Sequence, residues 1–331
     1  MSPFGKLPDP RHAFDHDEAA QAFADILDAR ASEDEIEAFL IALTARGETM
    51  VEIAAAAQAM RDRLIPIDAP AGAIDVCGTG GDGHHTLNVS TAVSLVVAAC
   101  EVPVAKHGNR AASSKAGAAD TLEALGLNME RAGQNAEETL KDLGICFLFA
   151  ANHHPAMKRI MPIRQRIGQR TIFNLMGPLA NPARVTRQLI GIARPTYVPI
   201  YAEALHHLGT EHSRVISGDE GLDELSLAGG NEVAIVEPDG VRYQRTTAAD
   251  AGLSAYPVEA LRGGDAAHNA LALRKLLQGE HGAYRDAVLF NAAAALMVAG
   301  VVDTMPEGVE EAAEAIDKGL ANALLNCWVA Y

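Results

Sequence analysis

The sequence predicts an α/β protein with a small all-helical domain in residues 1–70 and a larger domain in residues 71–331, whose mainly parallel central sheet is flanked by helices. Residues 17–64 repeat apolar side chains at helical spacing, whereas short β-prone runs alternate with helical runs beyond residue 71. Pro66, Pro70 and Gly72 separate the two regions. A chain of 331 residues also exceeds the ~250–300 residues at which single cores stop growing, which favours two domains.

The N-terminal region contains two apolar runs that each fit one face of a helix. They are Ile36, Phe39, Leu40 and Leu43, and then Val51, Ile53, Ala57 and Met60. Gly47 lies between them and is expected to separate two helices.

The larger region is predicted to alternate between strands and helices. Strands are expected at residues 74–77, 102–105, 145–149, 189–193 and 213–217, and helices at residues 89–100, 116–125, 137–143 and 197–208. Within residues 232–243, two more strands flank Pro238-Asp239-Gly240, which predicts one hairpin. The Ala-rich tail from Asn269 onward is predicted to be helical.

Composition excludes several classes of protein. The 27 Lys and Arg residues against 43 Asp and Glu residues give a net charge of -16, whereas nucleic-acid binding needs a positive surface. The four cysteines form no Cys-x-x-Cys pair, which argues against a zinc site or a disulfide framework. The N-terminus lacks a secretory apolar run, and the longest apolar stretch, residues 287–302, is shorter than a membrane span of ~20 residues. We therefore expect a cytoplasmic protein that binds neither nucleic acid nor membranes.

The strongest local signal is Gly78-Thr79-Gly80-Gly81-Asp82-Gly83, between a predicted strand and a predicted helix. Four glycines in six positions allow a tight turn, and its successive N–H groups can form a nest for an anion. No Gly-Lys-Ser/Thr follows, so this is not the Walker loop of nucleotide-binding proteins. The pattern favours phosphate binding over an ordinary glycine-rich turn.

Two polar segments follow at the same predicted edge of the sheet, because ligands bind outside the carboxyl ends of parallel strands. Residues 88–91, Asn-Val-Ser-Thr, could cap the next helix or hold a phosphate or metal ion. The segment after the strand at 102–105 carries Lys106, Arg110 and Lys115, which would supply charge for a polyanion, and Ser113 and Ser114, which would donate hydrogen bonds. The alternative is a solvated basic loop.

Two further candidates depend on these loops. Asp223 and Glu224 follow the strand at 213–217. They could bind Mg²⁺, because this ion prefers one or two carboxylates together with substrate phosphates. The alternative is an acidic loop on the surface. Arg164 has the side chain best suited to bind a carboxylate in a bidentate manner, although by itself it fits a surface arginine better.

His107 lies within the candidate site, whereas the adjacent histidine pairs elsewhere do not share a face and predict no metal site.

Taken together, these motifs resemble one known family. The order GTGGDG, TLNVST, KHGNRAASSKAGAADTLEALG, NLMGPLANP and GLDELSL is similar to that of the anthranilate phosphoribosyltransferases. The resemblance covers nearly the whole chain, and the joint order and spacing of the motifs are highly specific.

The resemblance implies transfer of the phosphoribosyl group of phosphoribosyl pyrophosphate to the amine of anthranilate, which is the second step of L-tryptophan biosynthesis. It also implies a requirement for Mg²⁺, with two ions per monomer. The helical domain, to which a helical segment near residues 165–185 would belong, is expected to form a homodimer. The implied contacts to phosphoribosyl pyrophosphate are Gly78, Gly81, Asp82, Thr86, Asn88, Val89, Ser90, Thr91, Lys106, His107, Gly108, Asn109, Arg110, Ala111, Ala112, Ser113, Ser114 and Ala118.

The same resemblance assigns the other ligands. Gly78, Asn109 and Arg164 would meet anthranilate, and Ser90, Asp223 and Glu224 would bind the metal. His107 is a candidate for a hydrogen bond to the amine and would act mainly by positioning, since the resemblance identifies no general base.

The chain departs from the family pattern at two places. Ala116-Gly117-Ala118 stands where many members have Ser-Gly-Ser, so Ala118 offers only its backbone N–H, and Ala111-Ala112 replaces a more polar pair. Weaker phosphate binding is expected from both. Two alternatives also remain: a pyrimidine nucleoside phosphorylase-like enzyme, and a non-catalytic relative that binds nucleic acid. The glycine loop, the Asp223-Glu224 pair and the acidic charge favour the transferase.

Overall fold

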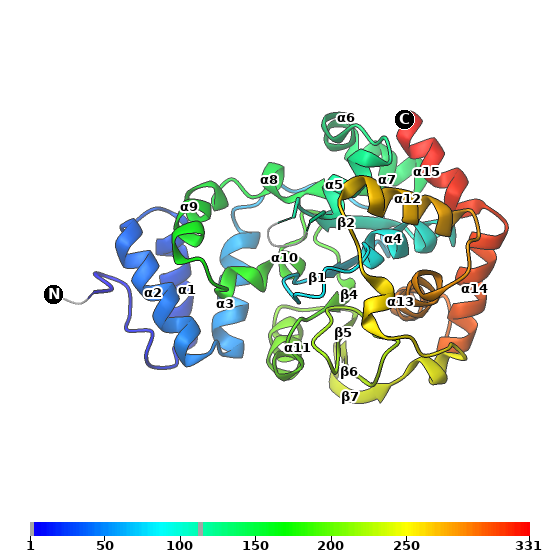
Figure 1. Ribbon diagram of the computed structural model, residues 1–331. Coiled ribbons are helices and arrows are strands. Elements are labelled where there is room, and N and C mark those ends of the chain that lie inside the picture. The colour runs from blue at the N-terminus through cyan, green and yellow to red at the C-terminus, as the bar shows by residue number, and fades with distance from the viewer. Residues whose placement is uncertain (1–2, 112–114) are drawn as a thin grey trace.

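The computed structural model describes residues 3–111 and 115–331 and has a helical part joined to a larger α/β part (Figure 1). Its sheet has the strand order β3-β2-β1-β4-β5-β6-β7, with the first five strands parallel and β6 and β7 antiparallel. The predicted fold class is confirmed, and so is the hairpin. The strands are β1 Ile74–Gly78, β2 Val104–Gly108, β3 Ile145–Phe149, β4 Arg187–Gly191, β5 His212–Gly218, β6 Asn231–Glu237 and β7 Gly240–Thr246.

The N-terminal region forms three helices, α1 (His16–Leu27), α2 (Glu33–Arg46) and α3 (Met50–Arg61), where the pattern had defined two. Each begins with a capping box, from Asp15, Ser32 and Thr49 respectively, in which the N-cap side chain and a glutamate three residues later satisfy free backbone N–H groups. Gly47 ends α2 with a φ of 95°, as expected of a residue that separates two helices.

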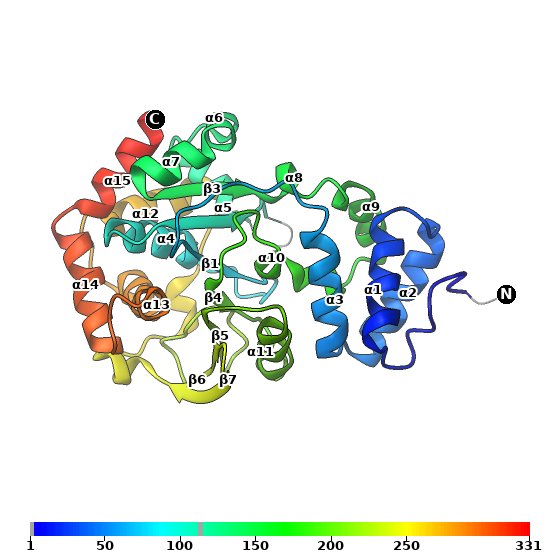
Figure 2. The ribbon, with the colours of Figure 1, turned by 180° about the vertical axis from the view of Figure 1, so that it is seen from behind.

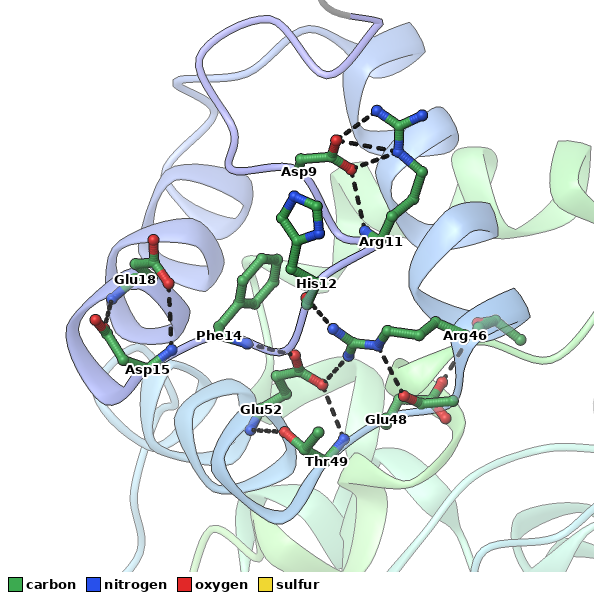
Figure 3. A network of polar contacts seen from close by, with 12 residues as sticks. Asp9, Arg11, His12, Phe14, Asp15, Glu18, Arg46, Glu48, Thr49 and Glu52 are labelled. Atoms are coloured by element: carbon green, nitrogen blue, oxygen red, sulfur yellow. Dashed lines mark hydrogen bonds and ion pairs between the residues drawn. The ribbon is translucent and has the colours of Figure 1, made fainter.

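A buried glutamate ties this helical part to the chain's first residues (Figure 3). Glu52 is fully buried, and its carboxylate accepts hydrogen bonds from the backbone N–H groups of Phe14 and Thr49 and from the guanidinium of Arg46. A buried carboxylate is tolerated only when it is paired and hydrogen-bonded, so this network holds the N-terminal segment against the α2–α3 turn.

The segment after β3 returns to the helical part. Helix α9 (Met157–Ile167) packs on α2, and α10 (Met176–Leu179) packs on α3. Ile160 and Ile163 of α9 share one apolar core with Phe23 and Phe39 of the N-terminal helices. The helical segment predicted near residues 165–185 thus contains the end of α9 and α10, and both contact the N-terminal helices.

Helices cover both faces of the sheet (Figures 1 and 2). One face packs against α4 and α13, and the other packs against α11, which also contacts α3. Among the described residues, none of the helices is both long and apolar enough to cross a membrane. The helices of this part are α4 Val89–Ala99, α5 Ala118–Ala124, α6 Met129–Gln134, α7 Ala136–Leu143, α8 Ala150–His153, α11 Val198–His207, α12 Ala266–Leu277, α13 Ala283–Ala299, α14 Met305–Asp317 and α15 Leu320–Ala330.

The strand order reverses between β1 and β4. The chain moves outward from β1 to β2 and β3 on one side, and from β4 to β5 on the other. In sheets of this kind the crevice outside the carboxyl ends of the strands at the reversal point is where ligands bind. The glycine loop after β1 lies at that point.

Candidate active site

The glycine loop leaves β1 with its backbone held from two sides. Thr79 N donates to Gly191 O at the end of β4 over 2.9 Å, and Gly80 N donates to Asp223 Oδ2 over 2.6 Å. Gly80 and Gly81 have φ values of 68° and 72°, a region that favours glycine. Within the described residues, the N–H groups of Gly81 and Asp82 have no hydrogen-bond partner. The loop therefore presents two free, adjacent donors.

Asp223 and Glu224 lie across the end of β1. A Cβ atom at Gly78 would come within 2.3 Å of Asp223 Oδ2, and one at Gly191 would come within 1.6 Å of the backbone oxygen of Asp223. Glycine at these two strand ends therefore makes room for the acidic loop. Sequence reasoning selected Gly78 but not Gly191, because a single glycine at a strand end carries no distinctive local signal.

Burial raises the pKa of both carboxyls. Burial raises the pKa of Asp223 to about 7, assisted by the nearby Asp82 carboxyl, and burial and Asp223 raise the pKa of Glu224 to about 8. Arg170 opposes the shift of Asp223, and Lys106 opposes that of Glu224. Burial is therefore the main cause of both shifts, and the neighbouring carboxyls strengthen them.

The donor set fits Mg²⁺. In the described part of the chain, no group of three His, Cys, Asp or Glu side chains is arranged as a metal cage. Mg²⁺ does not require one, since it usually takes one or two carboxylates and fills its remaining positions with water and substrate phosphates. Glu224 Oε1 accepts from Ser90 N over 3.1 Å, so two of the predicted metal residues are in contact.

The start of α4 is built differently from a simple helix cap. The Asn88 side chain makes no capping hydrogen bond; its Oδ1 instead accepts from Thr121 Oγ1 at 2.5 Å and from Asn269 Nδ2 at 2.9 Å. Thr91 is almost fully buried, and its hydroxyl has no partner among the described residues. Val89, the first residue of α4, is buried. Shortly before it, the backbone of Thr86 pairs with that of Arg262 in an isolated antiparallel β-bridge.

Lys106 and His107 lie within β2, whereas the sequence had placed them in a loop after a strand at 102–105. Their polar side chains concealed the strand, because each is buried against a specific partner. Lys106 Nζ donates to Val76 O over 2.8 Å, and the buried Asp75 carboxylate accepts from His107 N. The Lys106 ammonium therefore points beneath the site, where it acts on Glu224 electrostatically.

His107 has both ring nitrogens engaged. Nδ1 lies 2.9 Å from Gly177 O and Nε2 lies 3.3 Å from Nε2 of His154, and a carbonyl can only accept, so neutral His107 carries its proton on Nδ1. Burial and the facing His154 lower the pKa of His107 to about 3. This geometry favours a positioning role over a hydrogen bond to the amine. His154 was not among the predicted site residues.

The loop after β2 is only partly described. Asn109 is exposed, and its Oδ1 accepts from Arg110 N; the Arg110 guanidinium pairs with Asp120 and Glu123. Ala111 N donates to Asp120 Oδ2. Of the remaining predicted contacts, Ala112, Ser113 and Ser114 lie outside the described residues. Gly108 approaches Phe147 closely, and Ala118 begins α5, where its N–H has no partner in the described part of the chain.

Arg164 stands apart from this cluster, on α9. The only hydrogen bond of its side chain within the described residues is a weak one from Nη1 to Met161 Sδ at 3.8 Å, and burial lowers the pKa of the guanidinium. No acidic side chain of the described residues lies within ion-pair distance of it, so this half-buried guanidinium is available to a carboxylate. Within the described part of the chain, no hydrogen bond or ion pair joins the Arg164 side chain to the glycine loop.

Matches to known proteins agree with this geometry. Residues 7–64 match the helical bundle domain of the glycosyl transferase family, and residues 71–322 match the a/b domain of that family. The chain is 80% identical to the anthranilate phosphoribosyltransferase of Sphingopyxis alaskensis, over all of both chains, and 74% identical to that of Novosphingobium aromaticivorans, over 98% of each.

Solved structures give the same result. The anthranilate phosphoribosyltransferase of Thermus thermophilus is 41% identical with a TM-score of 0.92, covering 100% of this chain and 99% of that one. The Saccharomyces cerevisiae enzyme in complex with PRPP and Mg is 26% identical with a TM-score of 0.88, covering 99% and 96%. The chain belongs to the anthranilate phosphoribosyltransferases, the glycosyltransferases that join a phosphoribosyl group to anthranilate in tryptophan biosynthesis.

Proposed function

We propose that this chain carries out its family's phosphoribosyl transfer at the carboxyl edge of the sheet, where the β1 loop, the start of α4 and the Asp223-Glu224 pair meet. The observation that carries the proposal is the convergence of free donors and carboxylates. Gly80 N and Ser90 N donate to Asp223 and Glu224 respectively, while the N–H groups of Gly81 and Asp82 have no partner among the residues that the structure describes.

In this proposal the free N–H groups and the helix start hold phosphoribosyl pyrophosphate. Adjacent N–H groups in a nest and the positive end of a helix both favour anions, and the Thr91 hydroxyl adds an unpaired donor at α4. The assigned contacts are Gly78, Gly81, Asp82, Thr86, Asn88, Val89, Ser90, Thr91, Lys106–Ala111 and Ala118, together with the undescribed residues 112–114.

Ser90, Asp223 and Glu224 would hold Mg²⁺, with two ions per chain proposed. When bound, the metal would neutralise charge that builds on the departing diphosphate. The protein's part is to keep the two carboxylates in place through Gly80 N and Ser90 N. Lys106, whose ammonium donates to Val76 O in this conformation, favours the ionised form of Glu224 electrostatically.

Anthranilate would bind with its carboxylate on Arg164 and its ring near Gly78 and Asn109. The aromatic amine is neutral at pH 7, so it can attack the anomeric carbon without a strong base, and the diphosphate leaves with the electron pair of the broken C–O bond. Holding the amine in line is then the main contribution, and positioning supplies up to ~7–11 kcal/mol in ideal cases. A histidine with a pKa of about 3 is a poor base at neutral pH, which fits this mechanism.

The test is the loss of anthranilate fluorescence on mixing the protein with anthranilate, phosphoribosyl pyrophosphate and Mg²⁺. We expect a loss that requires all three and that stops when a chelator is added. Asp223→Asn should raise the Mg²⁺ concentration needed for half-maximal rate. An unchanged metal titration in that variant would remove Asp223 from the metal site, and steady fluorescence with the folded protein would refute anthranilate as the acceptor.

Two further properties belong to the same proposal. We infer a homodimer formed through the helical domain, and sedimentation of the purified chain tests it. We also infer a cytoplasmic location, since all four cysteines are unpaired, as expected in a reducing compartment.

A further inference from the structure

Arg170 contacts the glycine loop although it lies in none of the sequence motifs. It follows α9, and its guanidinium donates from Nη2 to Gly80 O over 2.9 Å and from Nη1 to Gly81 O over 3.0 Å. The side chain makes no ion pair with an acidic residue in the described part of the chain, so its hydrogen bonding is directed at these two successive carbonyls.

These two contacts determine where the free donors of the loop point. In a trans peptide, the C=O of one residue and the N–H of the next lie in one plane and point in opposite directions, and the described backbone has no cis peptide. Because the carbonyls of Gly80 and Gly81 point to Arg170, the N–H groups of Gly81 and Asp82 point away from it. Both groups are unpartnered among the described residues.

The charge of Arg170 acts in the same direction. Burial and the nearby Arg194 lower the pKa of Arg170, whereas Asp223 and Asp82 favour its charged form, and a guanidinium stays protonated in proteins. The side chain therefore places a fixed positive charge behind a loop that has the carboxyls of Asp82 and Asp223 close to it. This charge reduces the repulsion that a diphosphate would meet there.

Arg170 also connects the loop to the helical part. Arg166, four residues earlier, pairs with Glu33 and Glu37 of α2, while α9 packs on the same helix. The segment that carries Arg170 is thus anchored on the N-terminal helices, and its guanidinium reaches across to the α/β part.

We infer that Arg170 is a positioning residue for diphosphate binding: by holding the carbonyls of Gly80 and Gly81, it aims the N–H groups of Gly81 and Asp82 at the substrate. The inference rests on the proposed role of the glycine loop. A residue that acts in this way should affect phosphoribosyl pyrophosphate and leave anthranilate largely unaffected.

The experiment compares Arg170→Ala with Arg159→Ala, a matched control whose arginine also donates to a backbone carbonyl, that of Ala31 in the helical part. The readouts are the Kd for phosphoribosyl pyrophosphate with Mg²⁺ by calorimetry, the KM for anthranilate and the thermal unfolding midpoint. We expect Arg170→Ala to raise the Kd about 10- to 100-fold, the range for losing hydrogen bonds from a charged donor, with the KM for anthranilate within about twofold. Guanidinium ion added to this variant should partly restore binding, and Arg159→Ala should bind as the wild type does.

A wild-type Kd in folded Arg170→Ala, or an equal loss for both substrates without rescue, would overturn the inference. If that variant does not fold, Arg170→Lys replaces it, and its ammonium, which lacks the paired geometry, should give a smaller rise in Kd. A third variant separates this inference from the proposed function. Gly81→Ala strains a residue at φ 72° and crowds Arg170 Nη1 at 3.2 Å. Unchanged binding in Gly81→Ala would refute the loop as the diphosphate site, whereas weak binding there with normal binding in Arg170→Ala would refute only the role of Arg170.

Discussion

Gly78→Ala tests whether the acidic pair must lie against the end of β1. The φ of Gly78 is not positive, so alanine suits its backbone and any effect must come from the added methyl group. That group would lie 2.3 Å from Asp223 Oδ2 and 2.9 Å from its Cγ, whereas ordinary contact begins near 3.4 Å. The carboxyl must therefore move by about 1 Å, which is enough to break its hydrogen bond from Gly80 N.

A hydrogen bond to a charged group contributes about 1.5–3 kcal/mol, which corresponds to roughly 10- to 150-fold in an equilibrium constant. We therefore expect Gly78→Ala to raise the Mg²⁺ concentration for half-maximal rate and the KM for phosphoribosyl pyrophosphate by about that factor, as measured by anthranilate fluorescence. Gly229→Ala is the control, because its added Cβ meets nothing within 4 Å and its φ is not positive. Wild-type metal and substrate dependence in folded Gly78→Ala would show that the position of Asp223 does not matter for the reaction.

Three other changes have defined outcomes. Arg164→Ala should raise the KM for anthranilate about 10- to 100-fold and that for phosphoribosyl pyrophosphate much less, because it removes the guanidinium proposed to bind the anthranilate carboxylate. Equal effects on the two KM values would contradict this role of Arg164. Asn88→Ala should lower the free energy of unfolding by about 1–3 kcal/mol in urea titrations, because the buried Thr121 hydroxyl and Asn269 amide both lose an acceptor; an unchanged midpoint would contradict this. Burial lowers the pKa of His154 to about 4 in the folded protein, against ~6.5 in the unfolded chain. Between these two values the unfolded chain binds a proton that the folded protein does not, so the free energy of unfolding falls as the pH falls. The wild type should therefore lose about 2 kcal/mol more than His154→Gln between pH 7 and pH 5, and parallel losses would exclude this histidine as the cause.

The predictable part of the fold came from local periodicity. The strand at Ile145–Phe149 matched the expected range residue for residue, because an uninterrupted apolar run marks a strand that is buried on both faces. Gly47 separated two helices as predicted, since a glycine between two amphipathic runs is a strong local signal. The glycine loop was found for the same reason, and its place at the strand-order reversal follows from the topology.

What escaped prediction depends on contacts between distant residues. The strand β2 continues through Lys106 and His107 because Val76 O and the Asp75 carboxylate, about 30 residues away in sequence, satisfy their polar groups. Arg170 reaches a loop 89 residues earlier, and His154 reaches His107 across 47 residues. No local pattern encodes such pairs, and an arginine at a helix end is ordinarily a surface residue.

In the proposed function, the charges gathered at the acidic pair give a physical reason for a cation when a diphosphate binds. Among the described residues, the carboxyls of Asp82 and Asp223 raise the pKa values of their acidic neighbours, whereas Arg170 opposes the shift of Asp223 and Lys106, from strand β2, opposes that of Glu224. Burial is the main cause of the raised pKa values of Asp223 and Glu224, and the neighbouring carboxyls add to it. Divalent metal at the acidic pair would reverse the sign of the local field, so the carboxylates that repel the free diphosphate become the groups that recruit its metal complex.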